Sequence, residues 1–298
     1  MHKRTPPSAI QLQGGGELAY ACYGTSGGTP VFHFHGHPGS RLEGKLIDRA
    51  ARRLDVRLIS VDRPGMGYST FRPQRNLLDW AGTVVELADA LRIDRFAVQG
   101  ASGGGPYALA CAFRIPERLT ACGVIAGLGP VHELGVRDMM LLNRVQFTVA
   151  RRAPLMLRPL FWAFVGRNRR YLNDPEAVRR LAARLSQSSE VFGGPDLAEA
   201  YMVSTLEAFR QGAKGPAYDA RLYARPWGFR LADIELPVYL WHGEQDRHVP
   251  IGMARAVAQA IPHCRAKFFS KEDHLTVILR HLHEVLESMG DPDTMRAA

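Results

Sequence analysis

A serine set among glycines, in Gly100-Ala101-Ser102-Gly103-Gly104, is the strongest chemical signal in the chain. The apolar run Phe96–Gln99 before it is typical of a buried strand, and Gly103–Phe113 after it is typical of a helix. Such a turn strains the backbone of its central residue and leaves no room for neighbouring side chains. The Ser102 hydroxyl would then stand exposed at the positive end of the helix, as a nucleophile requires. A phosphate-binding loop would need GxGxxG or GxxxxGK[ST], and neither occurs.

A serine nucleophile needs a base, and the base needs an acid that orients it. Asp246 follows the apolar run Pro237–Trp241, and His274 follows Ala266–Phe269, so each stands just beyond an expected strand. The order Ser102, Asp246, His274 is the one in which a strand–helix architecture supplies nucleophile, acid and base. We therefore expect these three residues to form the catalytic triad.

Three neighbouring residues are weaker candidates. Glu244 lies nearer the strand than Asp246, His248 is expected on the surface at the start of the next helix, and Asp273 is expected to cap the last helix. The alternative position for the acid, after the expected strand Thr120–Ala126, holds Gly127-Leu128-Gly129. The lack of a carboxylate there favours Asp246.

Three alternating histidines, His33, His35 and His37, follow the short apolar run Pro30–Phe34. Acyl transfer needs hydrogen-bond donors aimed at the developing oxyanion, and we expect them to be the backbone N–H groups of His37 and Gly103. A metal site would require the strand to continue beyond His35, which the Pro38-Gly39 turn opposes, and no cysteine or carboxylate cluster accompanies the histidines. We expect no metal, and we expect a buried, hydrogen-bonded His35 that braces this loop.

The elements that must position these residues alternate between strand and helix from about residue 30. An edge hairpin is expected over Ile10–Tyr23, a helix capped by Asn76 follows the second strand, and a last helix is expected over Asp273–Met289. Between residues 131 and 228 the pattern is helical only. The sequence predicts a mostly parallel sheet wrapped by helices (1–130 and 229–298), interrupted by an all-helical domain (131–228).

The chain has 298 residues and a formal charge of +9, from 38 Lys and Arg against 29 Asp and Glu. Residues 131–228 hold 15 of these cations and 9 of the anions, or +6, which leaves 23 against 20, or +3, for the rest. Several arginines gather there (Arg151, Arg152, Arg158, Arg167, Arg169 and Arg170). They indicate solvated helix faces, or a surface that attracts anionic substrates or a membrane. No nucleic-acid-binding motif is present.

The four cysteines form no CxxC pair and lie in apolar stretches, as free thiols of a cytoplasmic protein do. The basic stretch Met1–Pro7 precedes no apolar run, so we expect no signal peptide. The uncharged run Phe96–Phe113 is long enough to span a membrane, but its glycines and Pro106 indicate a strand, a turn and a helix instead. We expect no membrane insertion.

Five motifs together resemble the α/β-hydrolase fold family: HGHPGS from His35, DRPGMGYS from Asp62, GASGGGPYALA from Gly100, GEQD from Gly243 and DHLTV from Asp273. The resemblance covers nearly the whole chain and implies an eight-stranded, mostly parallel sheet with a helical cap over the site. It also implies the oxyanion donors at His37 and Gly103. Epoxide hydrolases and haloalkane dehalogenases have a similar loop but use a carboxylate nucleophile, where this chain has Ser102.

A cofactor-free serine hydrolase that cleaves a small to medium, largely apolar ester is the function these residues favour. Carbon–carbon bond hydrolases and cofactor-free haloperoxidases of the same fold remain compatible with the motifs. Proline iminopeptidases favour a glycine where His37 stands and a bulky residue where Gly103 stands, so this chain departs from their pattern. A receptor that only binds a small ligand is a further alternative, although such proteins commonly lack the base or the acid.

Overall fold

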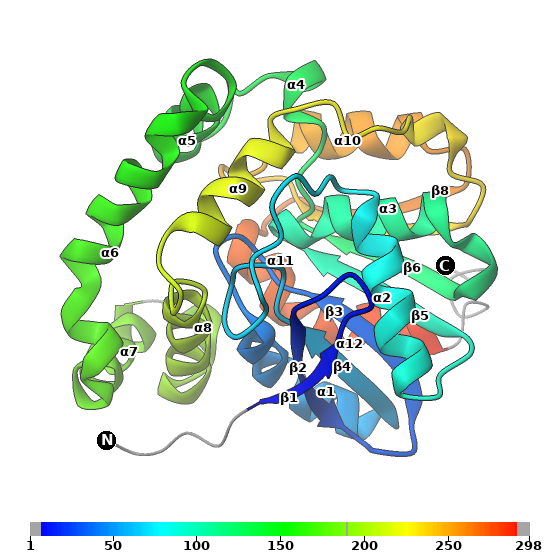
Figure 1. Cartoon of the computed structure of the whole chain (residues 1–298), viewed down its shortest axis with the longest axis horizontal. Coiled ribbons are helices and arrows are strands. Elements are labelled where there is room, and N and C mark those ends of the chain that lie inside the picture. The colour runs from blue at the N-terminus through cyan, green and yellow to red at the C-terminus, as the bar shows by residue number, and fades with distance from the viewer. Residues whose placement is uncertain (1–6, 189, 291–298) are drawn as a thin grey trace.

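An eight-stranded, mostly parallel sheet forms the centre of the molecule (Figure 1). The computed structural model describes residues 7–188 and 190–290; residues 1–6, which begin the basic N-terminal stretch, lie outside it. The strand order is β1-β2-β4-β3-β5-β6-β7-β8, with β1 and β2 antiparallel to their neighbours and the other pairs parallel. The strands are β1 Ser8–Gln11, β2 Glu17–Gly24, β3 Thr29–Phe34, β4 Val56–Val61, β5 Phe96–Ala101, β6 Leu119–Ile125, β7 Val238–Gly243 and β8 Cys264–Phe269. The predicted sheet and its edge hairpin are confirmed.

Helices cover both faces of the sheet, because successive side chains of a strand point to opposite faces. Val31 packs in the hydrophobic cluster that holds α1 and α12, whereas the next residue, Phe32, packs in the cluster that holds α2, α3 and α10. Every residue of β5 and of β7 is buried, as expected for central parallel strands. The helices beside the sheet are α1 Asp48–Arg53, α2 Asp79–Ala90, α3 Gly105–Arg114, α10 Ile251–Ala260, α11 His274–Arg280 and α12 Leu282–Gly290.

A helical insert separates β6 from β7 and lies along one side of the molecule, in green to yellow in Figure 1. After α4 Val131–Leu134 come α5 Leu141–Arg152, α6 Leu157–Asn173, α7 Pro175–Ser188, α8 Pro195–Glu207 and α9 Lys214–Tyr223. The insert has an apolar cluster of its own, in which Phe161 and Phe209 pack with alanines of α9 and with Met66 from the core. Within the described residues no helix is long and apolar enough to cross a membrane.

Two helix boundaries differ from the sequence prediction. Helix α2 begins at Asp79 rather than directly after Asn76, because Asn76 and Asp79 each accept a hydrogen bond from the other's backbone N–H and so close a turn before the helix. The last helix is two helices, α11 and α12, separated at His281. There the imidazole stacks on Phe269 at 3.8 Å and its Nδ1 lies 3.1 Å from Glu284.

A buried carboxylate, Asp219 on α9, joins the insert to the core. It accepts hydrogen bonds from Arg63 (2.7 Å), Arg75, Tyr107 (2.7 Å) and Tyr223 (3.2 Å). Burial opposes ionisation of Asp219, but the two guanidinium groups outweigh it and hold its pKa well below the usual value. We call these five residues the Asp219 cluster.

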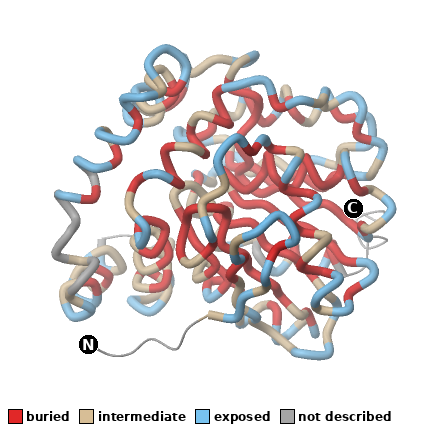
Figure 2. Tube along the Cα trace, in the orientation of Figure 1, coloured by how far each residue is buried: buried red, intermediate tan, exposed pale blue. Residues whose placement is uncertain are grey.

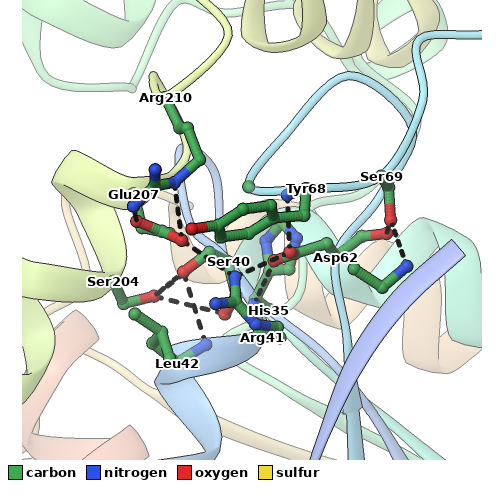
Figure 3. A network of polar contacts seen from close by, with 12 residues as sticks. His35, Ser40, Arg41, Leu42, Asp62, Tyr68, Ser69, Ser204, Glu207 and Arg210 are labelled. Carbon is green, nitrogen blue, oxygen red and sulfur yellow. Dashed lines mark hydrogen bonds and ion pairs between the residues drawn. The ribbon is translucent and has the colours of Figure 1, made fainter. Parts of the chain in front are cut away.

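A second polar network joins the insert to the core through Arg41, in the turn η1 Arg41–Leu46 (Figure 3). The Arg41 guanidinium donates to Asp62, at the end of β4, at 2.8 Å and to Glu207 of α8 at 3.0 Å. Arg210 caps Glu207 with two further hydrogen bonds of 3.0 Å. The insert is therefore fixed to the core by two sets of buried charges.

The Asp219 cluster yields a test of this attachment. Replacing Asp219 with Asn removes the charge that neutralises two buried guanidinium groups, so the free energy of unfolding should fall by about 3–5 kcal/mol. Denaturant unfolding measures the change. The control is Asp233→Asn, which breaks an exposed ion pair with Arg230 and should change stability little. Equal unfolding midpoints for the two variants would contradict the role given to Asp219.

Candidate active site

Ser102 occupies a sharp turn between β5 and α3. Its φ is +50°, a left-handed conformation that is strained for a residue with a side chain. A Cβ on Gly100 would lie 2.3 Å from the carbonyl oxygen of Gly104, and one on Gly104 would lie 2.0 Å from the carbonyl oxygen of Phe34. These contacts are with backbone atoms, which cannot move aside, so the glycines around Ser102 are required by space.

The structure brings Ser102, His274 and Asp246 together in one hydrogen-bonded chain. The Oγ of Ser102 lies 3.1 Å from Nε2 of His274, and Nδ1 of His274 lies 2.6 Å from Oδ2 of Asp246. The three residues stand just beyond the ends of β5, β8 and β7. These strands belong to the parallel run β5-β6-β7-β8, so their carboxyl ends lie along one edge of the sheet.

Asp246 and His274 are each fixed by local hydrogen bonds. Oδ1 of Asp246 accepts from the backbone N–H groups of His248 (2.7 Å) and Val249 (2.8 Å), which leaves Oδ2 to His274. Burial opposes ionisation of Asp246, but His274 and these donors outweigh it, so the pKa of Asp246 lies below its usual value. His274 begins α11, where Asp273 forms a capping box with Thr276, as predicted for Asp273.

The backbone nitrogen of His37 lies close to Gly103, on the other side of Ser102. A Cβ placed on Gly103 would be 3.3 Å from that nitrogen and 2.6 Å from Cβ of His37. The two residues expected to supply oxyanion donors are therefore neighbours beside the nucleophile. Any side chain at position 103 would crowd this space.

The His37 side chain has an unusual environment. Its ring meets the edges of Tyr223 (centroids 5.4 Å apart) and Phe161 of α6 (5.8 Å), and neither ring nitrogen has a hydrogen-bond partner in the described structure. Burial lowers the pKa of His37 to about 4, so the ring is neutral at pH 7. A neutral imidazole can both donate and accept a hydrogen bond, and both nitrogens of this ring are buried with neither used in the described structure.

Arg63 holds the backbone of the loop that carries His37. This arginine donates to the carbonyl oxygens of His35 and Gly36 while its Nε contacts Asp219. His35 is fully buried; its Nδ1 lies 2.8 Å from the oxygen of Gly36 and its Nε2 accepts from the backbone N–H of Arg63. The prediction that His35 braces the loop is confirmed.

One of the weaker candidates for the acid lies away from His274. Glu244 forms a half-exposed ion pair with Arg255 at 2.7 Å, and no hydrogen bond joins it to His274 in the described structure. His33 lies 3.0 Å from Glu43 and 3.3 Å from Gln99. The three alternating histidines thus have separate surroundings, and the described residues contain no group of side chains that could hold a metal ion.

Two residues near the site, His242 and Glu43, were not expected from the sequence. His248 is exposed, as expected, but its ring also lies beside His274 (centroids 4.8 Å apart). Buried His242 lies 3.4 Å from Asp246 while bonded to the carbonyl oxygen of Val249. Glu43 accepts two hydrogen bonds from the backbone N–H of Gly36, beside Ser102. His248 stands two residues from Asp246, a spacing that could have signalled its place; Glu43 offered no such signal.

A family model described as the alpha/beta hydrolase fold matches residues 29–280. The chain belongs to this family. The family resemblance seen in the motifs is thereby confirmed, together with the fold that it implied.

Curated relatives match the sequence of this chain over very different lengths. The chain is 36% identical over 117 residues to the acetyltransferase component of an acetoin cleaving system from Pseudomonas putida, a match over 39% of this chain and 31% of that protein. A candidate carbamate hydrolase of Azorhizobium caulinodans is 26% identical over 260 residues, which is 85% of this chain and 86% of the other. The chain thus covers less than half of the length of the acetyltransferase component.

Solved structures of other proteins share this fold at low sequence identity. An esterase from Exiguobacterium antarcticum superposes with a TM-score of 0.67 at 17% identity, over 98% of this chain and 100% of that one. An esterase from a Rhodococcus species gives 0.63 at 19% identity, over 96% and 99%. At these identities the likeness extends to the hydrolase fold alone.

The tight turn of this hydrolase at Ser102 can be tested with a pair of glycine variants. Gly104→Ala places a Cβ against the backbone of β3 and should lower the free energy of unfolding by about 1–3 kcal/mol. Gly82→Ala, in an open position on α2 where a Cβ meets nothing, should raise it by about 0.5–1 kcal/mol. Thermal unfolding of the two variants measures both effects, and a Gly104→Ala protein as stable as the parent would refute the steric account.

Proposed function

We propose that this hydrolase cleaves carboxylic esters by acyl transfer, with Ser102 as nucleophile, His274 as base and Asp246 as the acid that orients the base. The observation that carries the proposal is the unbroken chain from the Ser102 hydroxyl through both nitrogens of His274 to Asp246. A structural histidine has no need of a strained serine on one side and a buried carboxylate on the other. The arrangement has the roles and the geometry of a serine triad.

The reaction would proceed in two steps. Nε2 of His274 accepts the Ser102 proton as Oγ attacks the ester carbonyl, and the Nδ1–H donates to Asp246, which stabilises the imidazolium. The proton then passes from Nε2 to the leaving alcohol, and an acyl group remains on Ser102. Water, deprotonated by His274, attacks this acyl-enzyme and releases the carboxylic acid.

The negative charge on the carbonyl oxygen would be held by the backbone N–H groups of Gly103 and His37. Their closeness beside Ser102 supports this role, and the Arg63 hydrogen bonds to His35 and Gly36 would keep the His37 donor in place before substrate arrives. Donors fixed in advance stabilise a transition state more than donors that must first reorient. No cofactor takes part in the two proposed reaction steps.

The helical insert would act as the cap and select the substrate. Phe161 of α6 and Tyr223 of α9 border His37, so a group bound beside Ser102 would meet aromatic rings on the insert side. These surfaces suit a small to medium, largely apolar ester. The esterase structures of the same fold agree with this substrate class.

Substitutions in the triad test the proposal. Ser102→Ala should lower kcat/KM on activated acyl esters by a factor on the order of 10⁴ to 10⁶, because no nucleophile remains. Asp246→Asn should keep the fold but lower it by a factor on the order of 10⁴, because the base loses its orienting charge. Steady-state hydrolysis of esters of increasing acyl length, beside matched amides, measures both effects and the substrate range.

Glu244→Gln is the matched control, since it removes a carboxylate from the same turn as Asp246. Its ion pair with Arg255 lies at the surface, so kcat/KM should stay within about twofold of the parent. Full ester hydrolysis by Ser102→Ala, or a loss in Glu244→Gln as large as in Asp246→Asn, would contradict the proposed roles.

A further inference from the structure

Exposed apolar side chains are confined to one segment of the molecule. In the part of the chain that the structure describes, every large hydrophobic side chain left exposed lies between Leu134 and Trp162. Leu155 is 87% exposed, Leu141 72% and Trp162 56%, with Leu142, Met156, Val145 and Leu134 also exposed. They belong to α4, α5, α6 and the turn η4 Pro154–Met156 between α5 and α6. Figure 2 shows much of this outer arm in the colour of exposed residues.

From residue 139 onwards, this arm carries positive charge without any negative charge. Residues 139–173 contain seven arginines and no aspartate or glutamate. Arg144, Arg151, Arg152 and Arg158 are exposed and form no ion pair with any described residue; the side chains of Arg167, Arg169 and Arg170 lie outside the described part. On the neighbouring helix α7, by contrast, Arg179 and Arg180 pair with Glu176. The arm therefore presents four exposed arginines without an ion pair among the described residues.

A groove of about 690 Å³ adjoins the arm at Leu155 and Arg158. Its far wall is α9 and the residues just after it, which add Lys214, Arg221 and Arg225, and no acidic side chain lines it among the residues described. The Nε of Arg221 is buried and has no hydrogen-bond partner there. Arg75 also lines the groove and pairs with Asp219. The other four cations have no described carboxylate partner, and cations of this kind can bind phosphate groups.

We propose that the arm α5–η4–α6 and its adjoining groove dock on the surface of a membrane rich in anionic phospholipid. Leu155, Met156 and Trp162 would enter the boundary between headgroups and acyl chains, and the arginines would contact lipid phosphates. Peripheral membrane surfaces combine these two features, apolar side chains for burial and cations for the anionic headgroups. Tryptophan is favoured at this depth because its ring is apolar and its N–H is polar.

A membrane fits the arm better than another protein does. Leu155 and Trp162 protrude, and a bilayer accepts protruding side chains without a matching pocket. A second copy of this chain, docked face to face by a twofold axis, would set arginines against arginines. Phe161, which packs on His37 beside Ser102, is next to Trp162 on α6, so a docked arm would hold the candidate active site close to the lipid surface.

Trp162 gives the experiment a built-in reporter. The other tryptophans, Trp80, Trp227 and Trp241, are buried, with 3%, 3% and 0% of their surface exposed. Full-length protein should sediment with vesicles of phosphatidylcholine and phosphatidylglycerol but not with phosphatidylcholine alone, and salt should weaken the binding. Brominated acyl chains should quench the emission of the parent protein and not that of Trp162→Phe.

Charge and apolar variants locate the surface. Arg158→Glu should weaken partitioning into anionic vesicles about tenfold or more, and so should the pair Leu155→Ser with Met156→Ser. Arg53→Glu, which makes the same charge change at an exposed, unpaired position on α1, should leave binding near that of the parent. Ser102→Ala should bind as the parent does, which separates this proposal from the proposed catalysis.

Several results would overturn the proposal. Equal binding to neutral and anionic vesicles would remove the role of the arginines, and equal losses in Arg53→Glu and Arg158→Glu would remove the role of this arm. A dimer in sedimentation velocity that Leu155→Ser with Met156→Ser dissociates would assign the surface to a second copy. Binding to anionic vesicles without quenching of Trp162 would place the contact on another face.

Discussion

The position of the helical insert on the core of this α/β-hydrolase-fold protein depends on the buried ion pairs of the Asp219 carboxylate. This carboxylate lies on the helical insert and neutralises Arg63 and Arg75, which belong to the core and are buried. Arg63 in turn holds the backbone of His35 and Gly36, so the position of the loop carrying His37 is tied to the position of the insert. Separating a buried charge from its partner costs free energy, so the ion pairs of Asp219 oppose movement of the insert relative to the core. A displacement of the insert would therefore also displace the loop that carries His37, beside Ser102.

The sheet fixes the other side of the site. Parallel strands place the residues that follow β5, β7 and β8 along one edge, and the glycines around Ser102 allow β5 to turn into α3 at the spot where His274 can reach the hydroxyl. Packing inside the sheet thus sets the distance between Ser102 and His274, while buried charges set the position of the loop that carries His37. The surface of the insert is free of both constraints, and its exposed apolar and arginine side chains are available for contacts outside the molecule.

Much of this could be predicted from the sequence, because strand ends and tight turns leave local patterns. The strands, the helical stretch and the positions of Ser102, Asp246 and His274 follow from apolar periods and from glycine and proline. Contacts between distant segments leave no such pattern. Arg63 and Asp219 lie 156 residues apart, so nothing local pairs them. His248 and Glu43 are placed beside the site by tertiary packing, and the break between α11 and α12 falls at His281, which stacks on Phe269 of β8.

The most direct test of the central claim is labelling with a fluorophosphonate, which modifies only a serine activated by a base, followed by mass spectrometry of the digested protein. If His274 activates Ser102, one adduct is expected, on the peptide that holds Ser102, and none after His274→Ala. A protein that reacts at another serine, or that reacts equally without His274, would contradict it. A folded protein that takes no label would instead favour a hydrolase fold that binds a ligand without turning it over.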